Sequence, residues 1–333
     1  MTQQAGRGGG ADDARPVPPV DAQPAPEGAS EDRGPVLRSR ELTYLRAVVD
    51  RRLGLLVPPP SAHPAALHAA MRHILLAPGK RLRPLLALAA ALQLDVSEHA
   101  VLDFGCALEM IHAASLIIDD LPCMDDAAMR RAQPTTHVQF GEDVALLAAV
   151  ALLSRAFGVA ADAPVVPPQV RLDAVAALSL AVGSLGLCGG QFDDLRPAPG
   201  RTVKATEDVN RRKTGVLFIA AAEIAGRVAG VDEDRGAHLK SFAAHVGRAY
   251  QILDDILDAT ASSASLGKDV GKDVHKATLI AELGTPRARK LLVEHLASAA
   301  NASRLIGANA EGHEPLRLFL QSAFGELAPE RAP

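Results

Sequence analysis

Apolar residues recur at intervals of three and four along most of the chain, which is the spacing of one face of an α-helix. Six stretches show the pattern most clearly. They are "ELTYLRAVVDRRL" (41–53), "EHAVLDFGCALEMIHAASLII" (98–118), "EDVALLAAVALLSRAFGV" (142–159), "RLDAVAALSLAVGSLGL" (171–187), "GVLFIAAAEIAGRV" (215–228) and "GAHLKSFAAHVGRAYQILDDILDA" (236–259). The spacing predicts helix over each of these stretches.

Alternating patterns typical of β-strands are absent, and short clusters of Pro, Gly and Asp separate the apolar blocks, as in "RPAPGRT" (196–202). Residues 1–35 consist mainly of Gly, Ala, Pro and charged residues, which have little to bury, so we expect a disordered N-terminal tail. The remainder, 36–333, is predicted to be a single all-α domain built as a large helical bundle.

Composition excludes several classes of function. The net charge of −4 includes no broad basic field, so no nucleic-acid partner is expected. The 3 cysteines are an odd number without CxxC spacing, which argues against a disulfide framework or a cysteine-rich zinc site and fits a reducing compartment. Neither a signal peptide nor a membrane span is evident, so we expect a cytoplasmic protein.

Two clusters of aspartates each end an apolar helical run, "IIDDLPCMDDAAMRR" (117–131) and "YQILDDILD" (250–258). Asp254 and Asp258 are four residues apart and share a helix face, with Asp255 beside them. Asp119 and Asp125 are six residues apart, which on a regular helix would separate their side chains. Pro122 lies between them and should stop, bulge or kink the helix, so that Asp125 can return toward Asp119.

Carboxylates without neighbouring His or Cys ligands favour Mg²⁺, which is commonly held by one or two carboxylates together with substrate phosphates. A single cluster of this type is more often a solvated acidic helix end. Two clusters at the ends of apolar helices favour a site that binds a diphosphate through metal ions.

Basic residues lie near the acidic clusters in the sequence. "GKRLRP" supplies Lys80, Arg81 and Arg83 close to Pro84, which suits the first turn of a helix, and a helix N-terminus favours anions. This stretch predicts a second diphosphate site without metal. His112 precedes Asp119 by seven residues, two helical turns, and so falls on nearly the same stripe.

Other charged segments could be either ligand sites or ordinary surface residues and loops. Arg130 and Arg131, and Lys213 and Thr214 of "RRKTG", are individually more typical of a solvated surface than of a ligand site. "GGQFDDL" (189–195) is predicted to end a helix at its two glycines. "LGKDVGKDVHKATL" (266–279) could fold over a phosphate or be a plain charged loop.

Taken in order, "GKRLRP", "IHAASLIIDDLPCMD", "RR", "GGQFDDL", "KTG", "YQILDDILD" and "GKDVGKD" resemble the trans-prenyltransferases, the isoprenyl diphosphate synthases of the class I isoprenoid synthase fold. Within that family, "PCMDDA" and "GEDVALLAAVALLSRAFGV" look most like bacterial geranylgeranyl diphosphate synthases of carotenoid pathways. The sequence departs from the family pattern at Pro78 and Ala132, where glycine is usual, and at Ile118, where His is frequent.

The resemblance implies an all-α fold with a central cavity, a homodimer, and a set of three Mg²⁺ ions in each active site. The metal ligands that it implies are Asp119, Asp120, Asp125, Asp254, Asp255 and Asp258, with a less defined role for Asp120. The catalytic residues that it implies are Asp119, Asp125, Lys213 and Asp254.

The same resemblance assigns two substrates. Isopentenyl diphosphate would be bound by Lys80, Arg83, His112 and Arg131. The allylic diphosphate would be surrounded by Arg130, Lys213, Thr214, Gln251, Lys268 and Lys276. Gln191 and Asp194 match the family's GGQxxDL pattern and would support the cavity.

In the implied reaction the allylic diphosphate ionises and the double bond of isopentenyl diphosphate attacks the resulting cation. Ala114 and Ser115 lie about one helical turn before Asp119, where the growing apolar chain would extend. Because farnesyl-producing relatives often carry an aromatic residue at the position of Ala114, its small side chain favours a C20 product. The alternatives are a farnesyl or longer-chain synthase and a non-catalytic subunit, although such subunits usually lose an Asp motif. A terpene cyclase would lack "GKRLRP".

Overall fold

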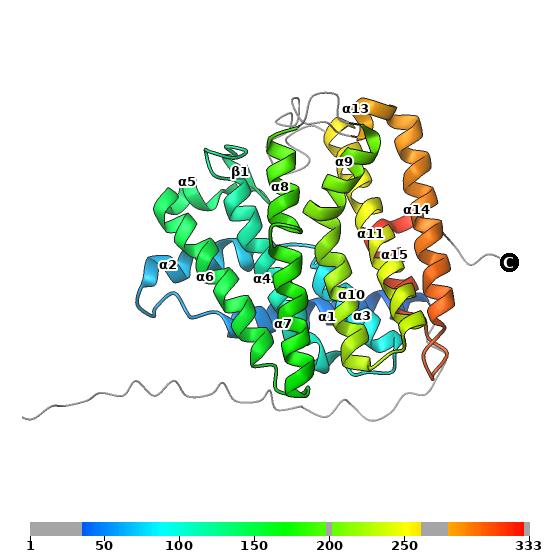
Figure 1. Ribbon diagram of the computed structural model, residues 1–333. Coiled ribbons are helices and arrows are strands. Elements are labelled where there is room, and N and C mark those ends of the chain that lie inside the picture. Colours follow the sequence, from blue (N-terminus) through cyan, green and yellow to red (C-terminus); the bar gives the residue numbers. More distant parts are fainter. Residues whose placement is uncertain (1–34, 198–201, 261–278, 330–333) are drawn as a thin grey trace, which may run out of the picture.

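The computed structural model describes residues 35–197, 202–260 and 279–329, and helices make up most of it (Figure 1). The longer helices are α1 (Pro35–Leu56), α2 (Ala65–Leu75), α3 (Leu82–Gln93), α4 (Leu102–Asp119), α6 (Glu142–Ala161), α7 (Pro168–Val182), α10 (Val216–Ala229), α11 (Glu233–Thr260), α14 (Thr285–Ile306) and α15 (Pro315–Phe324). The shorter ones are α5 (Thr136–Phe140), α8 (Leu187–Leu195), α9 (Val203–Asn210) and α13 (Leu279–Leu283). Two-residue strands β1 (Met129–Arg130) and β2 (Gln133–Pro134) form a small hairpin.

This arrangement confirms the predicted all-α class. Residues 1–34 of the expected N-terminal tail, and the predicted ligands Lys268 and Lys276, lie outside the described residues. The domain limits that the sequence suggested therefore remain a prediction.

Four of the six predicted helices correspond to single helices, and the stretch 98–118 begins in a 3₁₀ turn, Glu98–Ala100, before α4. Two further expectations were wrong. The stretch 171–187 is divided between α7 and α8, because the chain turns at Gly183–Gly186. Gly189 and Gly190, which were expected to end a helix, instead lie inside α8. A Cβ on Gly190 would come within 2.5 Å of the backbone nitrogen of Lys213, so this glycine allows a close approach of two segments rather than a break.

Small residues set the distances between the central helices. α3 is buried along most of its length, and it packs against α4, α10 and α15. Where α3 meets α4, a Cβ on Gly105 would lie 3.2 Å from the Cα of Pro84. Buried apolar side chains between Leu42 and Ala328 join these helices into a hydrophobic core. The position of the start of α3 against α4 is therefore set by packing, which matters for the basic residues that it carries.

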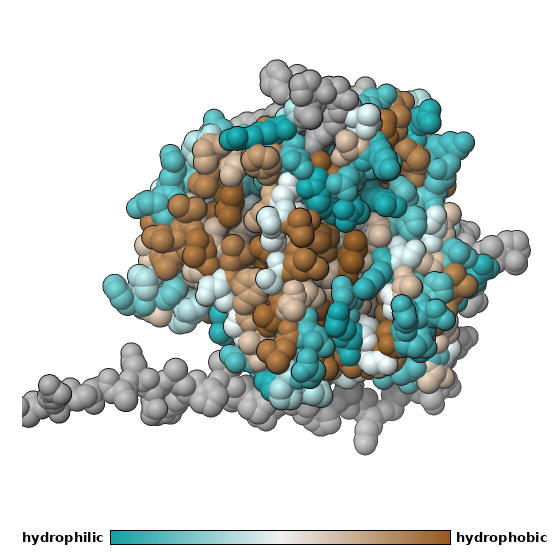
Figure 2. Space-filling model, in the orientation of Figure 1, coloured by the Kyte–Doolittle hydropathy of each residue, from teal (hydrophilic) through white to brown (hydrophobic). Residues whose placement is uncertain are grey.

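Apolar side chains are also exposed, on α6 and α7. By length and composition, two stretches could cross a membrane, Glu142–Ala161 and Pro168–Leu195, and 39% and 22% of their apolar windows are buried. Two such stretches are weak evidence for a membrane protein, because core helices of soluble proteins pass the same test. The space-filling view shows hydrophobic surface over this part of the molecule (Figure 2).

Candidate functional site

The first acidic motif lies where α4 ends. The helix stops at Asp119, and the chain then makes a tight turn through Pro122, closed by a hydrogen bond from the Met124 amide to the Leu121 carbonyl, N···O 2.9 Å. The backbone amide of Asp125 donates to the carbonyl oxygen of Asp119, N···O 2.9 Å. The expectation that the chain returns Asp125 to Asp119 is confirmed, with Pro122 in the turn that replaces the helix.

Asp120 has a different environment from its neighbours in the motif. Its side chain is 1% exposed and binds Arg130, with an Nη2···Oδ1 distance of 2.7 Å and an Nε···Oδ1 distance of 2.8 Å. Burial alone would lower the pKa of Arg130, but the hydrogen bond and charge of Asp120 raise it, so the guanidinium stays charged. Asp119 and Asp125 are partly exposed, whereas Asp120 is occupied in orienting Arg130.

The small hairpin after the first motif orients Arg131. Arg131 and Ala132 form its two-residue turn, with φ angles of 53° and 59°. Such turns require positive φ at both central positions and favour glycine, so Ala132 costs roughly 1 kcal/mol. The guanidinium of Arg131 lies against Gly79, where an added Cβ would be 3.1 Å from Nη1. Residues 79 and 131, far apart in the sequence, therefore meet.

Arg83 and Arg131 form a cationic cluster beside the first motif, and His112 lies within electrostatic range of both. Arg83 is 8% exposed, its guanidinium carbon is 4.9 Å from the centre of the Phe218 ring, and its buried Nε has no hydrogen-bond partner among the described residues. Burial, followed by the charges of Arg83 and Arg131, holds the pKa of His112 well below its usual value. Lys80 is exposed at the edge of the cluster. Apart from Lys80, the residues expected to bind isopentenyl diphosphate lie within electrostatic range of one another.

Arg81 lies in the same basic stretch but is bound by acidic side chains. It is 4% exposed, and it donates to Asp50, Nε···Oδ1 2.7 Å, and to Glu109, Nη1···Oε1 2.8 Å. Its Nη2 also donates to the carbonyl oxygen of Ala77 at 2.8 Å. Although burial opposes the charged form, Glu109 and Asp50 raise the pKa of Arg81. Arg81 is therefore a structural residue of this stretch.

The second acidic motif lies near the end of α11 and is linked to the "RRKTG" segment. Thr214 donates from Oγ1 to Gln251 Oε1 at 2.7 Å, and Gln251 donates from Nε2 to Asp255 Oδ1 at 2.8 Å. Gln251 therefore joins one acidic residue of the motif to a residue of a different helix. Asp254 and Asp258, four residues apart on α11, are partly buried.

The "RRKTG" segment is a π-helical turn, Arg211–Gly215. Such turns interrupt a helix and are frequent at functional sites. Glycines make room for it, since a Cβ on Gly247 would lie 2.9 Å from the Cα of Gly215. Lys213 binds Asp194, Nζ···Oδ2 2.7 Å, and Gln191 beside it is 8% exposed with no hydrogen-bond partner for its amide among the described residues.

The two acidic motifs and the arginines lie near one another. Burial lowers the pKa of Arg83, and the charge of Asp254 in the second motif opposes this effect. The charges of Asp119 and Asp125 in the first motif raise the pKa of Arg130. Figure 1 shows β1, which follows α4, and α13, which follows α11, at the same upper end of the bundle. Both acidic motifs therefore lie at one end of the bundle, and Arg83 of the cationic cluster lies within electrostatic range of Asp254.

The donors at this end suit Mg²⁺ in one respect. The side chains of Asp119, Asp125, Asp254 and Asp258 offer hard carboxylate oxygens, which Mg²⁺ prefers. Within the described ranges, no three His, Cys, Asp or Glu side chains converge as a ready metal cage. Carboxylate oxygens of this kind fit Mg²⁺, which commonly takes one or two carboxylates and completes its shell with phosphate oxygens and water.

Comparison with known proteins shows the family of this chain. The sequence pattern of the polyprenyl synthetase family matches residues 64–305. The chain belongs to this family. A geranylgeranyl diphosphate synthase of Pantoea ananas is 44% identical over 84% of this chain and 91% of its own length. Geranylgeranyl pyrophosphate synthase 11 (chloroplastic) of Arabidopsis thaliana is 38% identical over 87% of this chain and 83% of its own.

Solved structures of related enzymes have the same fold. An FPP/GFPP synthase of Zymomonas mobilis in its apo form matches with a TM-score of 0.76 and 30% identity, covering 88% of this chain and 99% of its own. A geranyltransferase of Helicobacter pylori complexed with magnesium and isoprenyl diphosphate matches with a TM-score of 0.74 and 25% identity. The match covers 90% of this chain and 98% of that one. Both matches support the all-α fold of this polyprenyl synthetase.

The two predicted chain-length residues differ in exposure. Ala114 is 0% exposed, whereas Ser115 is partly exposed and donates from Oγ to the carbonyl oxygen of His112 at 2.9 Å. His112, Ser115 and Asp119 are three and four residues apart, and all three are partly exposed on one stripe of α4. Ser115 therefore shares the stripe of the first acidic motif, and Ala114 packs beside it.

Some residues at the site escaped the sequence reasoning. Gly79 matters through the guanidinium that lies against it, which only the fold reveals. Glu109 had a visible signal, because it is the one acidic residue in the apolar run "FGCALEMIHAASLII" (104–118). An isolated carboxylate in a buried helix requires a cationic partner, so its burial could have been anticipated.

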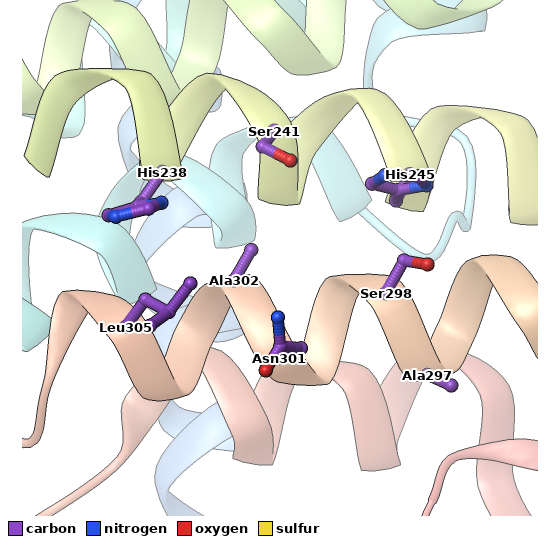
Figure 3. A pocket seen from close by; sticks show the side chains of 8 residues that line it. All are labelled: His238, Ser241, His245, Ala297, Ser298, Asn301, Ala302 and Leu305. Carbon is purple, nitrogen blue, oxygen red and sulfur yellow. The ribbon is translucent and has the colours of Figure 1, made fainter. Parts of the chain in front are cut away.

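A groove between α11 and α14 lies away from all these residues. His238, Ser241 and His245 of α11 face Ser298, Asn301 and Leu305 of α14 across it (Figure 3). His245 precedes Asp254 by nine residues, about half a revolution beyond two full turns, so the groove is on the opposite side of α11. Beside it, Nδ1 of His245 is 3.1 Å from Nδ1 of His295.

This histidine pair predicts a pH effect on stability. Burial, and then the charges of His245 and Arg248, lower the pKa of His295 to about 4. The unfolded chain takes up a proton near pH 6.5, so the free energy of unfolding should decrease as the pH falls from 6.5 toward 4. In His295→Gln the fall in melting temperature between pH 7 and pH 5 should be smaller. Exposed His99→Gln is the control, and an equal slope in both variants and the wild type would exclude the pair as the cause.

Proposed function

We propose that the protein is a Mg²⁺-dependent prenyltransferase that condenses isopentenyl diphosphate with an allylic diphosphate to give geranylgeranyl diphosphate (C20) and diphosphate. Family membership and the geranylgeranyl diphosphate synthases that match most of the chain support this activity. The observation that carries the proposal is the meeting, at one end of the bundle, of two acidic motifs with buried and partly buried arginines.

The acidic motifs would hold the metal ions. Asp119 and Asp125, with Asp254, Asp255 and Asp258, supply carboxylates for the proposed three Mg²⁺ ions, and bound Mg²⁺ would neutralise the charge of the diphosphate leaving group. Asp120 joins this set only if Arg130 releases it, because the two form a short ion pair. Its first role is to orient that arginine.

The cations divide between the two substrates. Arg83 and Arg131, with Lys80 at the edge, receive the diphosphate of isopentenyl diphosphate, and His112 can donate to it. Arg130 and Lys213, with Thr214 and Gln251, surround the allylic diphosphate. The predicted allylic ligands Lys268 and Lys276 lie outside the described residues.

Catalysis is then a matter of stabilising the departing diphosphate. Lys213 exchanges its bond to Asp194 for a phosphate oxygen, and Arg130 remains aligned by Asp120. Positive charge fixed in a site that excludes water stabilises the negative charge that develops as the C–O bond breaks. The double bond of isopentenyl diphosphate attacks the allylic cation, and the released diphosphate accepts the proton that is lost.

The role of the acidic motifs is tested by measuring turnover. Purified protein with Mg²⁺ and isopentenyl diphosphate is incubated with each of the C5, C10 and C15 allylic diphosphates, and the dephosphorylated products are separated by chromatography. Asp119→Ala and Asp254→Ala should lower turnover by at least about a thousandfold, because each removes a carboxylate that would hold the Mg²⁺ ions that neutralise the leaving group. Helical circular dichroism should stay near that of the wild type.

The control is Asp234→Ala, which removes an exposed carboxylate from the first turn of α11. It should leave turnover within about twofold of the wild type. Full activity of Asp119→Ala, or loss of its helical signal, would contradict the assigned role.

Chain length is proposed to be set by the stripe below the first acidic motif. The growing chain extends from Asp119 past Ser115, and Ala114 leaves room beside it. Ala114→Tyr should shorten the product toward C15. Ser115→Tyr should do the same with less repacking, because Ser115 is partly exposed and Ala114 is fully buried.

The products of both variants are compared by the same chromatography. Leu305→Tyr on α14, far from the stripe, is the control and should keep the product of the wild type. If both variants at 114 and 115 still made C20, other residues would limit the length of the growing chain.

A homodimer is the proposed assembly. Large apolar side chains on α6 and α7 are exposed to water, including Leu146 at 50%, Leu147 at 58%, Leu172 at 63% and Leu180 at 66%. Figure 2 shows hydrophobic surface over this part of the molecule, and a second copy of this chain would cover exposed apolar side chains of this kind. Burial of α6 and α7 in a dimer would also explain why these helices are so apolar without crossing a membrane. We therefore propose a cytoplasmic location.

The assembly is tested by sedimentation. The wild type should sediment as a dimer at micromolar concentration, and Leu180→Asp should shift it to a monomer, because a charge would be buried at the interface. Leu305→Asp, at a position 53% exposed on α14, is the matched control and should remain dimeric. A monomeric wild type would refute the assembly.

A further inference from the structure

Glu109 is a buried acid beneath the cationic cluster. It lies on α4, one turn before His112, and is 3% exposed. Its carboxylate accepts a hydrogen bond from Arg81, Oε1···Nη1 2.8 Å, and the two side chains are 4% and 2% exposed. A buried carboxylate is retained only where cations and hydrogen bonds compensate its loss of water.

Glu109 influences more than Arg81. Burial lowers the pKa of both Arg83 and Arg131, and in each case Glu109 is the strongest charge that opposes the effect. Asp50 also binds Arg81, but its side chain is 47% exposed. One buried carboxylate thus stabilises the charged forms of three guanidinium groups. Because one negative charge cannot neutralise three positive ones, the remaining positive charge can bind an anion.

Arg81 connects Glu109 to the backbone around it, through hydrogen bonds to Ala77 and Leu85. It has a φ angle of 51°, and its carbonyl oxygen accepts the hydrogen bond of the Leu85 amide at 3.0 Å, within the first turn of α3. Its Nη2 donates to the carbonyl oxygen of Ala77. Arg81 therefore fixes both ends of the segment 77–83, which includes Gly79, where the Arg131 guanidinium lies, and Arg83.

We propose that Glu109 is a positioning residue for the metal-free diphosphate site. Through Arg81 it holds the segment 77–83 so that Arg83 and Arg131 face the same diphosphate, and its charge stabilises the cluster before the substrate arrives. Glu109 touches no substrate. This inference rests on the proposed function, in which that diphosphate belongs to isopentenyl diphosphate.

The experiment separates the two substrates kinetically. Glu109→Gln, which keeps the shape and removes the charge, and Glu109→Ala are assayed at saturating allylic diphosphate and then at saturating isopentenyl diphosphate. We expect the KM for isopentenyl diphosphate to rise about tenfold or more, with the KM for the allylic substrate and kcat changed less than about threefold. Arg81→Lys, which removes the forked contact, should have the same selective effect.

The matched control is Asp103→Asn on the same helix. Asp103 binds Arg52 with a 2.7 Å Nε···Oδ1 and a 2.9 Å Nη2···Oδ2 distance, so the variant also breaks a largely buried ion pair, but outside the cluster. It should lower the melting temperature and leave both KM values unchanged. An equal rise of KM in Asp103→Asn, or an unchanged KM in folded Glu109→Gln, would overturn the proposal.

A binding measurement distinguishes failure of this inference from failure of the proposed function. Calorimetry with inorganic diphosphate in EDTA reports the metal-free site alone. The wild type should bind, and Glu109→Gln should bind about tenfold more weakly. Binding with this difference but no turnover would refute the reaction and keep the positioning role, whereas equal binding by both proteins would refute the positioning role.

Discussion

The site depends on keeping many like charges close together in a helical bundle before any substrate is present. Two acidic motifs and several arginines lie at one end of the molecule, and neither set is stable without compensation. The structure gives three cations an acidic partner: Arg130 binds Asp120, Lys213 binds Asp194, and Arg81 binds Glu109. Two of these acids, Asp120 and Glu109, are almost fully buried, so their contacts are little screened by water.

These pairs also orient the chain. Asp120 aligns Arg130 on the short hairpin, and the turn of that hairpin places Arg131 against Gly79. Gln251 joins Thr214 of the π-helical turn to Asp255 of α11. The first acidic motif is therefore linked to the hairpin, and the second acidic motif is linked to the π-helical turn. Close packing at Gly105, Gly190 and Gly247 makes these contacts possible.

The opposite sides of the same helices carry different constraints. α11 presents Asp254 toward the site and His245 toward the groove beside α14. α6 and α7 present apolar side chains to the surface, where a second copy of the chain would cover them. One set of helices thus supplies the core, the acidic motifs and the proposed interface.

The sequence by itself determined the helices, the two acidic motifs, the basic stretches and the family resemblance, because helical periodicity and motif order are local properties. It also predicted the return of Asp125 to Asp119, because proline in a short loop acts locally. Only the tertiary structure decided that Gly189 and Gly190 lie within α8, that Asp120 is committed to Arg130, and that Arg81 is bound by Glu109 and Asp50. These outcomes depend on the close approach of backbone segments and on charge compensation in three dimensions, and the spacing of residues along the sequence carries no information about either.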